Sequence, residues 1–156
     1  MAKAAAAAPA ASERPPQLRI EREFKAPPER VFAAFTDPKL FAEWWGPEGM
    51  SCPVCEIDPR VGGRWRTCMR GVQGEHWVSG VYREIVRPRR LVFTWAWEEN
   101  GVRGHETLVE IEFLPAGRNT KLVLNHTGFE TADSRDKHVH GWDSCFACLD
   151  RFLKGE

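Results

Sequence analysis

The chain has 156 residues, and its 22 lysines and arginines balance its 22 aspartates and glutamates, so its formal net charge is zero. A chain without net charge has no field to attract nucleic acid or an anionic membrane surface, and neither partner is expected. No stretch reaches the apolar length of a membrane-spanning helix. The length fits one domain, and the seven Trp and nine Phe suit a wide apolar interior.

The first 17 residues are rich in Ala and Pro and show no apolar period. Alanines interrupted by Pro9 do not form the bulky apolar run of a secretory signal. The sequence therefore predicts a disordered tail at 1–17, a single ligand-binding domain at 18–156 and a cytoplasmic location. The odd number of cysteines, five, also argues against a disulfide-framed secreted domain.

Alternating apolar residues predict a first strand at 18–24, where Arg22 is the one charged residue on the apolar phase and indicates a sheet edge. Two short helices are expected next. The first begins at Pro27-Pro28, and the second begins at Asp37-Pro38 with the aspartate as its cap. Helices this short are not stable alone, so we expect them to pack on a sheet.

Turn signals then separate six predicted strands in a meander, at 51–57, 64–70, 75–87, 91–97, 104–114 and 120–126. Alternation places one row from each of the last three on the face toward the core: Leu91, Phe93, Trp95, Trp97; His105, Thr107, Val109, Ile111, Phe113; Leu122, Leu124, His126. The phase of 75–87 stays open, because Trp77, Val81 and Ile85 compete with Val78, Tyr82 and Val86.

The last element is a long amphipathic helix at 131–153, which Asp133 or Ser134 is expected to cap. Its apolar stripe consists of Trp142, Cys145, Phe146, Leu149, Phe152 and Leu153. This helix is the only sizeable element able to cover one face of the sheet. A sheet of about seven strands curls under its own twist, so a cavity is expected between sheet and helix.

Six motifs in the same order resemble the activator of heat shock protein 90 ATPase-like branch of the SRPBCC superfamily, which is related to START and Bet v domains. They are Ala-Pro-Pro-Glu-Arg-Val-Phe from Ala26, Phe-Thr-Asp-Pro from Phe35, Glu-Trp-Trp-Gly-Pro from Glu43, Asp-Pro-Arg-Val-Gly-Gly-Arg-Trp from Asp58, Arg-Leu-Val-Phe-Thr-Trp from Arg90, and His-Gly-Trp from His140. The resemblance covers 18–153. It implies an α+β helix-grip fold, in which a seven-stranded curved antiparallel sheet wraps around the C-terminal helix and an apolar ligand cavity. It implies no fixed catalytic set.

The predicted function is the binding of a small hydrophobic or amphipathic molecule between the C-terminal helix and the sheet. The expected walls are Trp65, Trp95, Trp97, Thr107, Val109, Trp142 and Phe146, with His105 and His126 as polar handles. For the two histidines, a satisfied place in the core or at its rim is the first interpretation, and a polar anchor for a ligand is the second. His138 and His140 are expected to face solvent or to cap the helix.

Two Cys-x-x-Cys pairs, Cys52 with Cys55 and Cys145 with Cys148, raise the alternative of a four-thiolate zinc site. On a regular strand the first pair points to opposite faces, and on the helix only Cys145 lies squarely on the apolar stripe. Small buried thiols in the core are therefore expected, without a metal or another cofactor.

Two other function classes stay open. A chaperone-interaction module would use the outer sheet face or the short helices, and a homodimer could form through the free sheet edge or near Trp44 and Trp45. An acid–base enzyme would need one of the two core-phase histidines beside an acid. The candidate acids are Glu84, Glu98, Glu99 and Glu106.

Overall fold

A computed structural model of the chain describes residues 15–155, so the predicted tail lies almost entirely outside the described residues. Its elements, in chain order, are β1 (Gln17–Phe24), α1 (Pro28–Thr36), α2 (Pro38–Trp44), β2 (Ser51–Ile57), β3 (Arg64–Gly71), β4 (Gly74–Val86), β5 (Arg90–Glu99), β6 (Val102–Arg103), β7 (Thr107–Ala116), β8 (Asn119–Thr127) and α3 (Ala132–Leu153). Among these residues, no helix is both long and apolar enough to cross a membrane.

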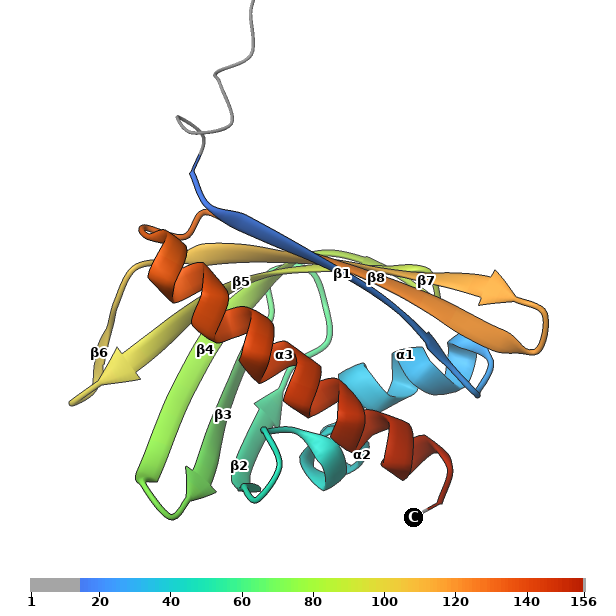
Figure 1. Cartoon of the computed structure of the whole chain (residues 1–156), viewed down its shortest axis with the longest axis horizontal. Coiled ribbons are helices and arrows are strands. Elements are labelled where there is room, and N and C mark those ends of the chain that lie inside the picture. Colours follow the sequence, from blue (N-terminus) through green and yellow to red (C-terminus); the bar gives the residue numbers. More distant parts are fainter. Residues whose placement is uncertain (1–14, 156) are drawn as a thin grey trace, which may run out of the picture.

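The strands form one antiparallel sheet in the order β1-β8-β7-β5-β4-β3-β2, with the two-residue β6 paired to β5. Figure 1 shows α3 crossing one face of this curved sheet, with α1 and α2 beside its C-terminal half. The predicted helix-grip fold is confirmed. β1 forms one edge, as the half-buried Arg22 indicated, and β2 forms the other.

The start of α3 differs from the prediction. The helix is capped by Thr131, whose hydroxyl accepts a hydrogen bond from the Ser134 amide at 3.0 Å, rather than by Asp133 or Ser134. Both expected caps lie inside the first turn, where Ser134 supplies an amide that the cap satisfies. The apolar stripe of the helix is buried as predicted, at Trp142, Cys145, Phe146, Leu149 and Leu153.

The open phase of β4 has a physical cause. The register between β4 and β5 shifts between Tyr82 and Glu84, which marks a β-bulge. Before the bulge Val78 and Tyr82 are buried in the core, and after it Ile85 packs against the core. Each of the two competing patterns is therefore correct in one half of the strand.

The two short helices pack as a unit against the sheet. The Asp37 carboxylate caps α2 by accepting a hydrogen bond from the Lys39 amide at 2.9 Å, as predicted. Trp44 and Trp45 are each only 3% exposed, and the Trp44 indole donates to the carbonyl of Ala34 at 2.9 Å. The expectation of an exposed surface at Trp44 and Trp45 is therefore wrong, because both rings are core residues.

β4 comes unusually close to its neighbours at Gly80. A Cβ atom there would lie 1.8 Å from the Thr94 carbonyl oxygen and 2.6 Å from the indole nitrogen of Trp65. That nitrogen donates to the same carbonyl at 3.2 Å. The missing side chain at Gly80 therefore lets the Trp65 ring reach across β4 to β5.

We expect Gly80→Ala to lower the free energy of unfolding by about 1–3 kcal/mol or more, because the new methyl group overlaps backbone atoms that cannot rotate away. Urea unfolding followed by tryptophan fluorescence measures this change. The matched control is Gly141→Ala in α3, where a Cβ atom meets nothing within 4 Å. This control should raise stability by about 0.4–1 kcal/mol. Equal stabilities of the two variants would contradict the packing described at Gly80.

Candidate ligand-binding site

Trp95 lies at the centre of a cluster of rings beneath α3. It is 4% exposed, and its ring centroid lies 5.2–6.1 Å from those of Trp45, Trp65, Trp97, His126, His138 and Trp142. These rings fill most of the space between helix and sheet, and they leave an interior void of only about 20 Å³ beside Trp95. The wide interior that the aromatic content suggested is therefore largely occupied by the rings themselves.

A larger pocket of about 230 Å³ opens beside this cluster, between α3, the end of α2, β3 and β5. Its lining is almost entirely apolar: Trp45, Pro47, Met69, Trp95, Trp97, Lys137, His138, Gly141, Trp142 and Cys145. We call this space the helix pocket. It shares Trp45, Trp95 and Trp142 with the interior void, so the two spaces adjoin the same rings.

A second, more polar pocket of about 200 Å³ is lined by Trp95, Trp97, His105, Thr107, Phe129, Glu130, Ser134 and His138. Trp97 and His138 line both pockets, and the Trp97 indole donates to His138 Nε2 at 2.9 Å. This hydrogen bond connects β5 to α3 and closes the ring cluster on that side.

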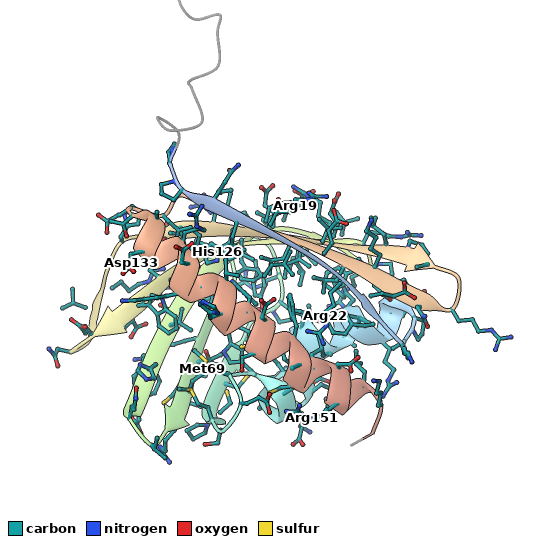
Figure 2. All side chains as sticks on the ribbon, in the orientation of Figure 1. Arg19, Arg22, Met69, His126, Asp133 and Arg151 are labelled. Atoms are coloured by element: carbon teal, nitrogen blue, oxygen red, sulfur yellow. The ribbon has the colours of Figure 1, made fainter. Side chains whose placement is uncertain are left out.

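A chain of hydrogen bonds joins α3 to three strands through His126, which is fully buried on β8. The Trp142 indole donates to His126 Nδ1 at 3.1 Å, His126 Nε2 lies 2.7 Å from the Thr107 hydroxyl, and that hydroxyl donates to the Trp95 carbonyl at 3.1 Å. Because an indole can only donate and the hydroxyl hydrogen is already used, the imidazole is neutral with its proton on Nε2. Figure 2 shows His126 beside the N-terminal half of α3.

His138 is also held neutral, but as the opposite tautomer. Its Nε2 accepts from Trp97, so its Nδ1 carries the proton and donates to the Ser134 carbonyl at 2.7 Å. Burial lowers the pKa of His126 well below its ordinary value, and a proton gained by His138 would lower it further by repulsion. Burial also lowers the pKa of His138, although the bond to Ser134 opposes this effect. Neither ring can gain a proton without losing a hydrogen bond.

The structure brings some of the predicted wall residues together and not others. Trp95, Trp97 and Trp142 line the helix pocket, Trp65 borders the interior void, and His105 and Thr107 line the polar pocket. The remaining three, Val109, His126 and Phe146, are fully buried and line none of these spaces. The assignment of all nine to a ligand stays a prediction.

The two predicted polar handles differ in how many ring nitrogens the protein already uses. Both nitrogens of His126 are used by the protein, as described above. His105 is exposed, and its Nε2 lies 2.6 Å from the Gly128 carbonyl. His138 was expected to face solvent or to cap the helix, but it is half-buried against the ring cluster. It lies four residues before Trp142, and this helical spacing could have placed it on the buried side.

The four cysteines of the alternative zinc site do not converge. Within residues 15–155, no group of three or more His, Cys, Asp or Glu side chains is placed to hold a metal ion. Cys145 lines the helix pocket, while Cys52 and Cys148 lie at a different one. Burial raises the pKa of Cys145 to about 12, so this thiol is a neutral part of the apolar wall.

The acids proposed as catalytic partners do not pair with either predicted histidine. Glu98 accepts hydrogen bonds from Arg66, and Glu84 accepts one from Arg90. Glu106 pairs with Arg103 at 3.1 Å. The carboxylate that comes nearest to His105 is that of the exposed Glu130, at 3.9 Å. Glu84, Glu98 and Glu106 are therefore engaged by arginines rather than by a histidine.

Comparisons with known proteins agree with this architecture. Residues 25–154 match the family described as Activator of Hsp90 ATPase homolog 1-like protein. The chain belongs to this family.

Solved structures of similar proteins support the same assignment. The AHSA1 protein of Silicibacter pomeroyi is 33% identical, with a TM-score of 0.82 over 89% of this chain and 98% of that one. A Chromobacterium violaceum protein is 30% identical, with a TM-score of 0.79 over 87% and 95%. A Rhodobacter sphaeroides protein is 26% identical, with a TM-score of 0.76 over 89% and 93%. A comparison with curated proteins gave no match.

The AHSA1-type fold generally serves as a ligand-binding helix-grip scaffold. In this chain, the neutral histidines His126 and His138 make the stability of the fold depend on pH. Because their folded-state pKa values lie below the ordinary 6.5, the unfolded chain binds more protons as the pH falls through that value. We expect the free energy of unfolding to be fully retained above about pH 6.5 and to fall below it, by up to about 1.4 kcal/mol per pH unit for His126 alone. Urea unfolding between pH 7.5 and about pH 5 measures this slope.

A His126→Gln variant should be less stable at pH 7.5 but should lose most of this slope, because the titrating group is gone. His140→Gln is the matched control, since His140 is exposed on α3, and the slope of this variant should equal that of the unmodified chain. Carboxylates such as Glu98, whose pKa is lowered by its bond to Arg66, contribute only below about pH 4.5. If the free energy of unfolding of His126→Gln falls with pH as steeply as that of the unmodified chain, the assignment of a neutral, buried His126 is wrong.

Proposed function

We propose that this protein binds a small apolar or amphipathic molecule in the helix pocket between α3 and the sheet. The observation that carries the proposal is Gly141, a glycine in the middle of α3 that lines this pocket. Glycine within a helix is about 1 kcal/mol less favourable than alanine. A Cβ atom at this position would meet no other atom within 4 Å, so no packing contact within residues 15–155 requires the glycine.

The absence of a side chain at Gly141 keeps the pocket open. The indoles of Trp45, Trp97 and Trp142 form its flat walls, and the neutral thiol of Cys145 belongs to the same lining. A volume of about 230 Å³ exceeds the roughly 150 Å³ of an apolar cavity that binds benzene. The dimensions and chemistry of the pocket therefore suit a compact molecule of one or two rings.

The test fills the pocket from the helix. Gly141→Leu should weaken the binding of a bicyclic probe, 1-indanone, at least about tenfold by occupying its space, and isothermal titration calorimetry measures the affinity. Gly141→Ala is the matched control. It should weaken the binding of the probe less than Gly141→Leu does, because a methyl group fills only a small part of the pocket.

The same three proteins can be compared by native mass spectrometry directly after purification. A copurified organic molecule present in the unmodified chain and in Gly141→Ala, and absent from Gly141→Leu, would identify the natural ligand class. Equal affinity of all three proteins for 1-indanone would refute the proposal and would favour the alternative of a protein-interaction module.

A further inference from the structure

One buried polar atom stands apart in this ring cluster. The indole nitrogen of Trp95 is the only buried side-chain nitrogen or oxygen among residues 15–155 that has no hydrogen-bond partner. The other indoles around it donate to an acceptor: Trp45 to the Thr67 hydroxyl, Trp65 to the Thr94 carbonyl, Trp97 to His138 and Trp142 to His126. Leaving a buried donor unpaired costs about 1–3 kcal/mol.

The rings that surround Trp95 cannot supply the missing acceptor. Its four tryptophan neighbours carry indole nitrogens that only donate. The one acceptor nitrogen of His126 is taken by Trp142, and that of His138 is taken by Trp97. No acceptor among residues 15–155 reaches this N–H, so a molecule that enters the cluster can supply one.

We infer that the ligand carries an uncharged hydrogen-bond acceptor on a flat aromatic body, and that this acceptor binds the Trp95 indole N–H. The inference rests on the proposed function and specifies which molecules the site selects. Trp95 forms part of the wall of the interior void, the helix pocket and the polar pocket alike. A carbonyl, an ether oxygen or an aromatic ring nitrogen supplies such an acceptor without a charge that the apolar lining would penalise.

Charge at the pocket lies only at its rim. Lys137 is the one cationic residue in the lining, and its side chain is 78% exposed and lies 3.3 Å from the Asp133 carboxylate. The Trp95 nitrogen is shielded from solvent, so an acceptor reaches it when a covering ring moves. Trp97 is the ring that we expect to move, because it is 38% exposed and its indole is held by a single hydrogen bond to His138.

The experiment compares two ligands in two proteins. Indane and 1-indanone differ by a methylene group and a carbonyl, and Trp95→Phe removes the N–H while keeping a ring. The ratio of the affinity for 1-indanone to that for indane should fall about five- to tenfold in Trp95→Phe, which corresponds to the loss of one hydrogen bond. Taking the ratio within each protein cancels the different hydration of the two ligands.

Trp45→Phe is the matched control, because Trp45 lines the same pocket but its N–H already binds Thr67. It should keep the affinity ratio of the unmodified chain. A second measurement avoids substitution at the core. In ¹⁵N-indole-labelled protein, 1-indanone should shift the Trp95 N–H proton further downfield than indane does, while the Trp45 signal should respond equally to the two ligands.

The outcomes separate this inference from the proposed function. If both ligands bind and the affinity ratio is the same in Trp95→Phe, the acceptor inference is wrong while the pocket remains the binding site. If neither ligand binds the unmodified chain and no organic molecule copurifies with it, the proposed function fails and the inference fails with it. A Trp95 signal that indane shifts as much as 1-indanone also contradicts the inference.

Discussion

The hydrogen-bonded chain from Trp142 through His126 and Thr107 to Trp95 is the interaction on which the rest of the site depends. It joins α3 to β8, β7 and β5 in one connected set of polar groups inside an apolar core. In each of these hydrogen bonds only one of the two groups can donate. The hydrogen bonds therefore fix the position of the helix over the sheet as well as the tautomer of the imidazole. Apolar contacts alone would allow the helix to slide.

The fold could be predicted largely from the sequence, because its signals are local and repeated. Alternation placed the inner rows of β5, β7 and β8, except for His105, which lies before the start of β7 and is exposed. Asp37-Pro38 marked the start of α2. The errors occur where a local rule had a competitor. A bulge after Tyr82 changed the phase of β4, and Thr131 stands one residue before the helix in the position that a cap requires.

The candidate site was less predictable, because its character depends on how rings from distant elements share space. Periodicity correctly placed Trp95 and Trp142 on the inner side, but it could not show that the rings would fill the interior and leave the larger pocket beside it. It also could not show that His126 would satisfy both nitrogens within the protein. Hydrogen-bond pairing across the core is set by geometry that no single segment contains.

Two unfavourable local features meet at the helix pocket. A glycine at position 141 weakens the middle of α3, and the unpaired N–H of Trp95 weakens the core of the sheet, each by about 1 kcal/mol or more. Both could be removed without changing the fold, by alanine in the helix and by phenylalanine in the strand. Their coincidence on the wall of one pocket has a simple explanation if the bound molecule fills the space beside Gly141 and pairs with Trp95. In that case, ligand binding offsets the stability that the glycine and the unpaired N–H cost the ligand-free protein.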